Sequence, residues 1–501
     1  MELERLDVLI VGAGLSGIGA ACHLRRRCPE RRLAIVEARA ASGGTWDLFR
    51  FPGVRSDSDM YTLGYAFRPW RDGKAIAPGA DILRYVRDTS REHGVEPLIR
   101  YRHRVRRAAW SSSNACWTVE IDVEHDGAPP ARTHIACSFL LMCSGYYDYA
   151  AGHAPAFPGL DDYAGRVVHP QFWTDDIAWA GRRVVVIGSG ATAMTLVPAL
   201  AGSARHVTML QRSPTWVVAR PSADPLAARL AGRLPWRWVH AITRWKQVLL
   251  SQYIFALARR KPQKLRQLLL GGVRAGLGPG HDAALARDFT PRYDPWWQRL
   301  CLLPDGDLFR ALREGRADVV TDEIERFTRS GIALRSGRHL EADLVVTATG
   351  LEMKLLGGVE LVVDGRRVDP AQAYSYKGTM FSGVPNLVGV FGYTNTSWTL
   401  KADLASEWVC RLLRHMQRHG HVQCVARIDD AQKIEAPWID LTSGYVQRAL
   451  ARLPKQGAHA PWRLSQSYLR DIAVLRYGRI DDGVLQFDAA REVPATLGAT
   501  A

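Results

Sequence analysis

The stretch DVLIVGAGLSGIGAACHLRRR, residues 7–27, decides the fold. The residues after Asp7 are apolar and largely β-branched, which predicts a buried strand, and the second half of the stretch predicts a helix. Gly12, Gly14 and Gly17 stand between them in the spacing GxGxxG. The first glycine permits a tight turn, the second lets a pyrophosphate approach the backbone, and the third lets the helix pack on the strand. Because a helix N-terminus attracts phosphates, the stretch predicts a dinucleotide-binding unit.

The next strand of this unit, LAIVE at residues 33–37, ends in Glu37. An acid about twenty residues after the glycines accepts hydrogen bonds from ribose hydroxyls. Glycine spacing alone is a weak signal, because glycine turns are common, whereas a strand, glycines, a helix and an acid in this order are specific. The carboxylate suits a ribose without a 2′-phosphate, and we therefore expect FAD at this unit.

A second unit is predicted by RRVVVIGSGATAMTLVPALA, residues 182–201, in which Gly188 and Gly190 hold the first two glycine positions. Ala193 holds the third, where alanine is an accepted variant. The following strand ends in Gln211 and Arg212 rather than in an acid. A carboxylate there would repel a 2′-phosphate and a guanidinium would pair with it, so this unit predicts NADPH. Without the glycine motif, Arg212 would be read as a solvated surface arginine.

Two dinucleotide units in one chain point to a bound flavin and a diffusing nicotinamide, because hydride passes from the nicotinamide to the flavin. LLMCSGYY at 140–147 and LVVTATG at 344–350 each read as a buried strand that ends in small residues and glycine. Such strand ends let the chain pass close to a cofactor, although a core strand with a turn explains them equally well. The predicted fold class is α/β, with two Rossmann-like dinucleotide-binding domains, for FAD and NADPH, and a helical insertion.

Composition narrows the class of protein without choosing a partner. The chain has 501 residues, is 47% hydrophobic and 23% charged, and carries a formal net charge of +16. These proportions are typical of a globular protein with two or three domains, and the charge suits phosphorylated cofactors, an acidic membrane or nucleic acid. No nucleic-acid-binding module is recognisable, so no nucleic-acid partner is expected. The eight cysteines form no CxxC pair, which argues against zinc or a dithiol redox centre, and neither a signal peptide nor a membrane span is found; we expect a cytoplasmic protein.

Longer segments carry a family resemblance that runs almost end to end. They include GGTWDLFRFPGVRSDSDMYTLGY (43–65), QRLCLLPDGDLFRA (298–311) and GYTNTSWTLKADL (392–404). With these segments the chain resembles the class B flavoprotein monooxygenases, specifically the Baeyer–Villiger monooxygenases, and among them the mycobacterial ethionamide-activating group and its bacterial relatives.

The fingerprint of the Baeyer–Villiger family, F-x-G-x-x-x-H-x-x-x-W-[PD], reads YAGRVVHPQFWT at residues 163–174. The glycine, His169 and Trp173 match in register, whereas Tyr163 replaces phenylalanine and Thr174 replaces proline or aspartate. In the family this stretch links the two nucleotide domains and couples their motion. The resemblance therefore implies that His169 and Trp173 are hinge and positioning residues rather than proton carriers.

The resemblance implies an FAD-containing, NADPH- and O2-dependent monooxygenase that converts ketones to esters or lactones through a C4a-peroxyflavin, with sulfoxidation as a side activity. The family's essential arginine falls on Arg299 and its carboxylate partner on Asp57. A fixed cation in a water-poor site stabilises an anionic peroxide, and a buried cation is costly unless it is paired. Arg299 would not be selected from the sequence without the family.

The other site residues follow from the glycine motifs and the resemblance, and no metal site is predicted. For FAD they are Gly12, Gly14, Ser16, Gly17, Glu37, Thr45, Trp46, Asp47, Leu48, Asp57 and Val105. For NADP they are Arg55, Ser56, Gly188, Ser189, Gly190, Ala191, Thr192, Ala193, Gln211 and Arg212.

The two predicted domains are each formed by separate parts of the chain. Residues 1–150 and 349–501 are assigned to the FAD domain, 155–215 and 295–348 to the NADPH domain, and 216–294 to a helical insertion. Residues 220–274 hold twelve Lys or Arg and a single acid, Asp224. The resemblance implies a helical insertion near the substrate pocket at this position, and we favour such a lobe within the protein, since solvated basic faces are common. The alternative is peripheral contact of basic amphipathic helices with the inner face of the cell membrane.

The sequence leaves other functions open. A flavin monooxygenase that oxygenates nitrogen or sulfur would share the two cofactor units, and so would a non-catalytic redox sensor, since fold does not fix function. A disulfide reductase is less expected, because no cysteine pair is spaced for it. The expected partners are O2 and a small apolar carbonyl or sulfur compound. The sequence does not determine the chain length of the substrate, the regioselectivity, the pathway or the oligomeric state.

Overall fold

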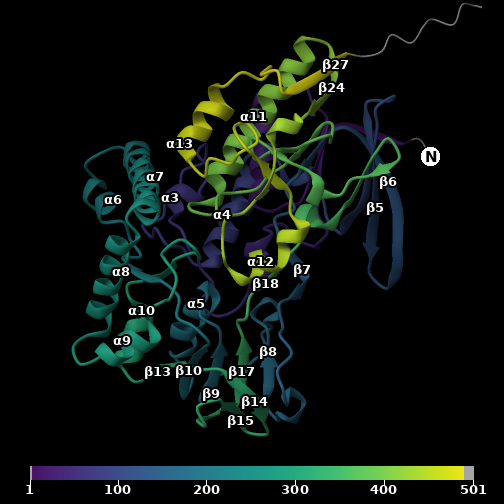
Figure 1. Cartoon of the computed structure of the whole chain (residues 1–501). Helices are drawn as coiled ribbons and strands as arrows, with labels where there is room; N and C mark the ends of the chain where they lie inside the picture. Colours follow the sequence, from purple (N-terminus) through teal and green to yellow (C-terminus); the bar gives the residue numbers. More distant parts are fainter. Residues whose placement is uncertain (1–2, 490–501) are drawn as a thin grey trace, which may run out of the picture.

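The computed structural model describes residues 3–489, which form two sheet units and a lobe of helices at their side (Figure 1). Residues 1–2 and 490–501, assigned above to the ends of the flavin domain, lie outside the described residues.

The first sheet is built around β1, whose neighbours β2 and β6 both run parallel to it. The pairing places Ile10 of β1 opposite Ile35 of β2 and Leu141 of β6, and all three side chains are buried. The strand order is β20-β19-β4-β5-β6-β1-β2-β3, with β23 also paired to β6. The bounds are β1 (Glu4–Val11), β2 (Leu33–Val36), β3 (Ile99–Arg100), β4 (His103–Ser111), β5 (Cys116–His125), β6 (Ala128–Met142), β19 (Glu360–Val363), β20 (Arg366–Arg367) and β23 (Leu387–Gly389).

Helices from both ends of the chain cover this sheet. α1 (Leu15–Arg27) packs against α11 (Trp398–Arg418), so the segment after residue 349 returns to the first unit. His23 of α1 lies 3.3 Å from the carboxylate of Asp403 on α11, and both side chains are buried. The segments of the chain before and after the second unit therefore share one core.

The second sheet has the order β13-β10-β9-β17-β8, and every neighbouring pair in it is parallel. The central strands are buried along almost their whole length, as expected when helices cover both faces of a parallel sheet. The strands are β8 (Arg166–Val168), β9 (Arg183–Ile187), β10 (His206–Gln211), β13 (Ala317–Thr321) and β17 (Leu344–Thr347), and two of the helices are α5 (Ala191–Leu200) and α10 (Asp307–Arg313). The predicted α/β class with two Rossmann-like units is confirmed.

Smaller elements connect and extend the two units. β7 (Tyr147–Gly152) pairs with β18 (Leu351–Met353) where the chain passes between them. The others are α2 (Thr45–Leu48), α3 (Met60–Leu63), α4 (Gly79–Glu92), β11 (Val217–Arg220), β12 (Cys301–Pro304), β14 (Ile324–Thr328), β15 (Gly331–Leu334), β16 (His339–Glu341), β21 (Ser375–Tyr376), β22 (Met380–Phe381), β24 (His421–Ala426), β25 (Lys433–Pro437), α12 (Gly444–Ala449), β26 (Lys455–Gly457), α13 (Tyr468–Asp471) and β27 (Leu485–Ala489).

The helical lobe consists of α6 (Pro225–Leu230), α7 (Trp236–Arg260), α8 (Pro262–Leu277) and α9 (Asp282–Asp288). α7 lies against α3, and the Arg244 guanidinium donates to the carbonyl oxygens of Tyr61 at 2.6 Å and Gly64 at 3.0 Å. The lobe is therefore attached to the first unit by hydrogen bonds as well as by packing. Among residues 3–489, no helix combines the length and the apolar character needed to cross a bilayer.

Candidate active site

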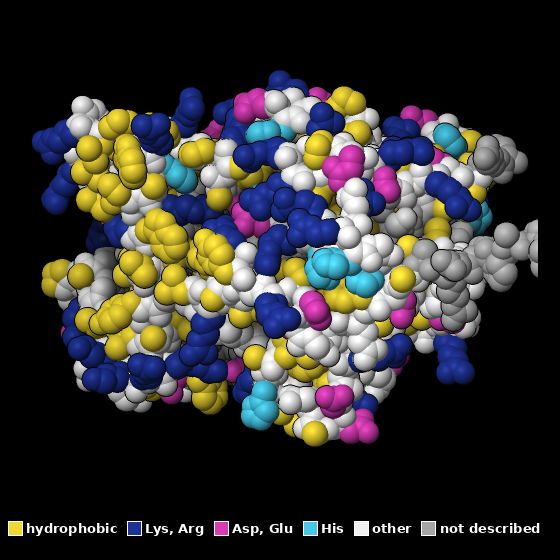
Figure 2. Space-filling view, turned by 90° about the horizontal axis from the view of Figure 1, so that it is seen from above, with side chains coloured by type: hydrophobic (Ala, Val, Ile, Leu, Met, Phe, Trp, Pro, Cys, Tyr) yellow, Lys and Arg dark blue, Asp and Glu magenta, His cyan; other side chains and the backbone are white. Residues whose placement is uncertain are grey.

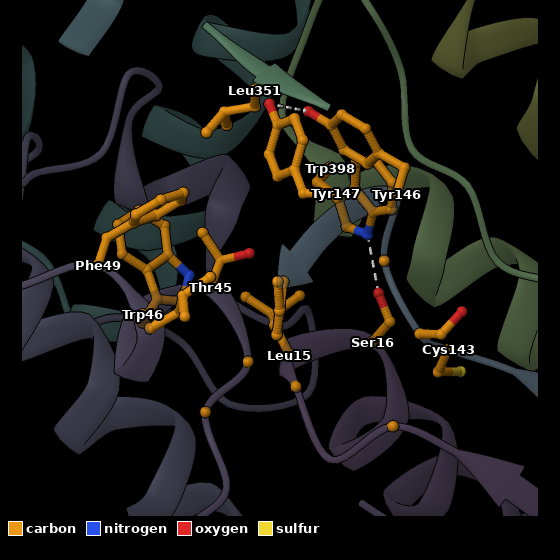
Figure 3. A pocket seen from close by; sticks show the side chains of 18 of the residues that line it. Leu15, Ser16, Thr45, Trp46, Phe49, Cys143, Tyr146, Tyr147, Leu351 and Trp398 are labelled. Atoms are coloured by element: carbon orange, nitrogen blue, oxygen red, sulfur yellow. Dashed lines mark hydrogen bonds between the residues drawn. The ribbon is translucent and has the colours of Figure 1, made fainter. Parts of the chain in front are cut away.

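A cavity of 550 Å³ is lined by the loops at which the two sheet units meet, and Figure 3 shows part of its wall. The predicted site residues that line it are Gly12, Gly14, Ser16, Glu37, Thr45, Trp46, Leu48, Arg55, Ser56, Asp57, Val105, Ala191, Thr192 and Arg299. Those that do not line it are Gly17, Asp47, Gly188, Ser189, Gly190, Ala193, Gln211 and Arg212. The cavity thus joins the first glycine turn, the start of α5 and the Arg299 loop.

The first glycine turn is shaped by close backbone contacts. Gly12 has φ +104°, and a Cβ there would lie 2.6 Å from the carbonyl oxygen of Cys143. A Cβ on Gly17 would lie 1.9 Å from the carbonyl oxygen of Gly12, so α1 packs directly on the turn. Gly14 differs, because a Cβ there would meet only Gly44 at an ordinary contact distance of 3.5 Å. Gly12 and Gly17 are therefore required by the fold, whereas Gly14 keeps the backbone open towards the cavity.

Glu37 closes the turn from the end of β2. Its buried carboxylate accepts hydrogen bonds from the backbone N–H groups of Ala13 at 2.7 Å and Arg39 at 2.9 Å. Burial raises the pKa of Glu37, and the two hydrogen bonds oppose that rise. An acid that both supports the turn and lines the cavity fits the adenosine side of a dinucleotide without a 2′-phosphate. The residues present therefore fit FAD.

The segment around α2 divides its residues between the cavity and the protein interior. Thr45, Trp46 and Leu48 line the cavity, whereas the Asp47 carboxylate is buried against Arg39 at 2.6 Å and Arg87 at 2.7 Å. The sequence grouped all four near the flavin. Asp47 acts on the cavity indirectly, because its two ion pairs hold α2 in place.

Arg299 and Asp57 are brought together in the cavity wall from two loops. The Arg299 Nη1 atom lies 3.4 Å from the Asp57 Oδ2 atom, and the carboxylate raises the pKa of Arg299 further above its ordinary value. Arg299 is 34% exposed by surface area, and since it lines the cavity this surface is available to a ligand there. Arg299 therefore supplies a permanent positive charge in the cavity wall, and the Asp57 carboxylate 3.4 Å away partly balances it.

Aromatic residues that the sequence analysis did not assign complete this wall. The hydroxyl oxygens of Tyr146 and Tyr147 lie 2.7 Å apart, and the Tyr146 ring stacks on Trp398 with ring centroids 5.0 Å apart (Figure 3). The Trp398 indole N–H donates to Ser16 Oγ at 2.8 Å, so Ser16 is held by the wall itself. Burial raises the pKa of Tyr146, Tyr147 and nearby Tyr445, which keeps all three phenols neutral beside Arg299. The signal for the two adjacent tyrosines was their place after a strand that ends in glycine.

The loop that carries Asp57 also reaches the second unit. The Arg55 guanidinium donates to the carboxylate of Asp307 on α10 at 2.5 Å and lies 3.5 Å from the carbonyl oxygen of Met194 on α5. Ser56 is buried, and its Oγ accepts from the backbone N–H of Ala77 at 3.2 Å. Residues 55–57 therefore contact the second unit through Arg55, the backbone of Ala77 through Ser56 and the Arg299 loop through Asp57.

The second glycine turn repeats the geometry of the first. Gly188 has φ +136°, and a Cβ there would lie 2.3 Å from the carbonyl oxygen of Ala348, just as Gly12 abuts Cys143. A Cβ on Gly190 would have no neighbour within 4 Å, so the backbone there is open. Ser189 Oγ donates to the carbonyl oxygen of Ser213 at 3.1 Å, and Ala193 is fully buried. The turn therefore offers a free backbone surface at the start of α5, which suits a pyrophosphate.

Gln211 and Arg212, which follow this turn in the predicted site, face different environments. The Gln211 amide is buried and donates to the carbonyl oxygen of Asp288 at 2.8 Å and to Thr321 Oγ1 at 2.9 Å. Arg212 is exposed and forms no ion pair with any residue in the range 3–489. Of the two, only Arg212 is free to pair with a phosphate.

The fingerprint histidine holds one of the two links between the units. His169 Nε2 lies 3.0 Å from the carbonyl oxygen of Gly350, between β17 and β18, and Nδ1 accepts from the backbone N–H of Gln171 at 3.2 Å. Burial lowers the pKa of His169, so the ring is neutral with its proton on Nε2. Trp173 is buried against Trp179. These contacts are those of positioning residues.

The comparisons with known proteins agree with this geometry. Residues 77–236 match the family model described as flavin-binding monooxygenase-like, and residues 10–72 match an NAD(P)-binding Rossmann-like domain. The chain is 50% identical over 492 residues to the FAD-containing monooxygenase EthA of Mycobacterium tuberculosis, covering 98% of this chain and 99% of that protein.

Solved structures share the fold. An oxidized steroid monooxygenase bound to NADP superposes with a TM-score of 0.69 at 21% identity, covering 84% of this chain and 88% of that one. A polycyclic ketone monooxygenase from Thermothelomyces thermophila gives 0.74 at 17% identity, covering 98% and 91%. With a full-length relative at half identity and both cofactor units in place, the chain belongs to the class B flavoprotein monooxygenases, among the FAD-containing monooxygenases related to EthA.

Proposed function

We propose that this protein is a Baeyer–Villiger monooxygenase that uses FAD, NADPH and O2 to convert apolar ketones to esters or lactones, with sulfoxidation as a side activity. The observation that carries the proposal is the Arg299–Asp57 pair in the cavity wall. One fold relative, named as a polycyclic ketone monooxygenase, supports the choice of a carbonyl substrate.

The chain's own residues hold the two cofactors. The first glycine turn and Glu37 would bind the adenosine diphosphate part of FAD, with Thr45, Trp46, Leu48 and Val105 along the cavity. The second turn and Arg212 would bind NADPH, with Arg55 and Ser56 on the loop between the two units. When bound, the flavin supplies the activated oxygen and the nicotinamide supplies the hydride.

Arg299 stabilises negative charge on the reacting oxygen, because a fixed guanidinium in a cavity of low polarity interacts more strongly than one in water. Asp57 holds the guanidinium in place and offsets the cost of burying it. The neutral tyrosines around it add no competing negative charge. Together they favour attack by an anionic oxygen on a carbonyl carbon over transfer of a neutral oxygen to a soft nucleophile.

The test is product analysis with a ketone series of increasing chain length and one thioether, comparing wild type with Arg299→Ala. We expect the variant to keep FAD and to lose ester formation by roughly a hundredfold or more. Arg335→Ala, which changes an exposed arginine in the turn after β15, is the matched control and should keep wild-type rates.

Each alternative has its own outcome. Ester formation by Arg299→Ala at the wild-type rate contradicts the assigned role. A wild type that gives sulfoxide but no ester from any ketone is an N- or S-oxygenating monooxygenase. A wild type that binds NADPH but consumes no O2 with any substrate is a binding or sensing protein.

A further inference from the structure

α7 differs from an ordinary surface helix because it exposes a row of large apolar side chains. Its buried face mixes the polar His240, Thr243, Arg244 and Gln247 with the apolar Val239, Val248 and Ala258. Its exposed face carries Trp238, Ile242, Trp245, Leu249 and Tyr253, which are between 41% and 62% exposed. Their spacing of three or four residues places these five side chains in one row. We call this row, Trp238 to Tyr253, the apolar stripe.

Water is a poor environment for such a surface. A surface helix of a globular protein normally turns its apolar side to the core and its polar side to solvent. Here the polar side is needed inside, because Arg244 donates to two backbone carbonyls and the Gln247 amide donates to Asp224. The five side chains of the stripe therefore stay 41–62% exposed in the described chain, and covering them further requires something outside it.

The stripe continues beyond α7 onto the neighbouring segment. The Trp245 ring lies 6.2 Å from the Tyr468 ring at the start of α13. Leu469, Val474 and Tyr477, which follow in the chain, are also exposed. Figure 2 shows hydrophobic side chains gathered over the helical lobe, with Lys and Arg side chains at the edges of that region. The surface is too broad to be a scatter of single exposed residues.

Positive charge lies at both ends of the stripe. Arg229, Arg233 and Arg237 are exposed before it, and Arg260, Lys261 and Lys264 are exposed after it. None of these six forms an ion pair with a residue in the range 3–489. Between residues 220 and 274 the only acid is Asp224, and it is buried with Lys246 and Gln247. No exposed acid of the lobe's helices α6–α8 offsets the charge.

We propose that the apolar stripe and its basic ends form a docking surface for an anionic lipid bilayer, with α7 lying in the plane of the interface. Tryptophan and tyrosine suit the boundary between headgroups and acyl chains, and arginine and lysine suit anionic headgroups. A second copy of this chain is the poorer partner, because pairing two such faces would bring like charges together. Residues 238–253 extend over about 22 Å along the helix, which suits a helix lying on the surface.

The docking surface lies close to the cavity. Ser251, on the same helix, has its Oγ 3.3 Å from Thr396 Oγ1, and Thr396 lines the cavity. An apolar compound dissolved in the bilayer would therefore be held near the cavity wall. The docking itself does not depend on the proposed reaction, and it is tested by binding alone.

The experiment is co-sedimentation of the holoenzyme with vesicles of phosphatidylcholine alone and of phosphatidylcholine with phosphatidylglycerol, at low salt and at about 0.5 M salt. We expect binding to the anionic vesicles at low salt, weakened by salt, and little binding to neutral vesicles. The double variant Trp245→Gln, Leu249→Gln should bind anionic vesicles at least roughly tenfold more weakly than wild type, because the apolar contribution is lost. Arg260→Gln with Lys261→Gln and Lys264→Gln should lose roughly tenfold or more through charge.

Phe172→Gln is the matched control, since Phe172 is an exposed aromatic residue of the second unit, and it should bind as wild type. FAD absorbance and the thermal midpoint show that each variant is folded, and tryptophan quenching by brominated lipid gives a second measure with wild type alone. Absence of wild-type binding at low salt overturns the proposal, and so does equal binding to neutral vesicles. A wild-type dimer that the stripe variant converts to monomer, with vesicle binding unchanged, shows that the stripe binds a second copy and overturns the proposal too.

Discussion

At the scale of single residues, we relate the choice of cofactor to the side chains that are available to contact the ribose or its 2′-phosphate. In the second unit, the buried Gln211 amide donates hydrogen bonds to Asp288 and Thr321. Of the pair Gln211 and Arg212, only Arg212 is exposed. A guanidinium pairs with a phosphate dianion, whereas the first unit places the buried Glu37 at the corresponding strand end. We therefore propose that one side chain in each unit, Glu37 and Arg212, distinguishes the two dinucleotides.

Replacing Arg212 by glutamate should reverse the preference for NADPH. The carboxylate would repel the 2′-phosphate, so we expect KM for NADPH to rise by roughly a hundredfold and KM for NADH to change little. Steady-state oxidation of both nucleotides checks this. Gln211→Glu is a poor route to the same switch, because it places a charge in the interior. An unchanged NADPH KM in Arg212→Glu would assign the phosphate to another residue.

The first and second glycine positions of the motif predict different outcomes for a substitution by alanine. Gly12→Ala forces a residue with φ +104° against the Cys143 carbonyl, and we expect a loss of about 2–4 kcal/mol in stability together with loss of FAD. Gly190→Ala meets no protein atom within 4 Å, so it should fold normally and weaken NADPH binding only. Thermal midpoints and flavin content separate the two, and a stable, flavin-free Gly190→Ala would contradict this assignment of the turns.

At the scale of elements, α7 shows how a helix can be held by polar contacts. His240 is buried on its inner face next to Tyr61, and burial with the nearby Arg244 lowers the pKa of His240 to about 4. The ring is therefore neutral in the folded protein at pH 7. In the unfolded chain the same ring takes up a proton near its ordinary pKa of 6.5.

This difference makes the stability of the protein dependent on pH. A histidine whose folded pKa is lowered contributes stability that is present above pH 6.5 and is lost as the pH falls from 6.5 towards 4. When the pH falls from 7 to 5, we expect the free energy of unfolding of wild type to decrease by about 2 kcal/mol more than that of His240→Gln. Chemical unfolding at the two pH values measures it. His169 and His93 also have lowered pKa values, so the variant should retain part of the slope, and identical slopes would contradict the assignment to His240.

At the scale of the whole molecule, the cavity exists only where parts of both units meet. The loop of residues 55–57 contacts α10 and α5 of the second unit through Arg55 and the Arg299 loop through Asp57. β7 and β18 carry the chain between the units, and His169 binds the Gly350 carbonyl there. These polar contacts join the units together with apolar packing, because Phe51, just before residues 55–57, is buried in the core of the second unit.

Breaking the Arg55–Asp307 pair should loosen this arrangement. We expect Arg55→Ala and Asp307→Ala each to reduce stability by about 1–3 kcal/mol, with the double variant losing less than the sum. The coupling energy from the unfolding of all four proteins is the measurement. Additive effects would mean that the 2.5 Å contact contributes nothing between the units. Lys433→Ala, which removes an exposed pair with Asp430, is the control and should change stability little.

The sequence by itself determined the two glycine turns, the α/β class and the two kinds of dinucleotide, because these features are local. In each unit the chain forms a strand, then a turn with positive φ, then a helix. The residue at the end of the next strand follows only a short distance later in the sequence. The tertiary structure decided which side chains are buried and which remain exposed or reach the cavity. It buried Gln211 and Asp47, set Tyr146 and Tyr147 beside Arg299, and turned the apolar side of α7 outward.

Arg299 shows the boundary between the two. Its pairing with Asp57 joins loops from distant parts of the chain, and the family resemblance, not the local pattern, selected it. No periodicity or spacing records such a contact, because its free energy depends on burial and on a partner that only folding brings near. The same holds for the apolar stripe, because the sequence predicted amphipathic helices with a basic face and only the folded protein shows which apolar side chains are exposed.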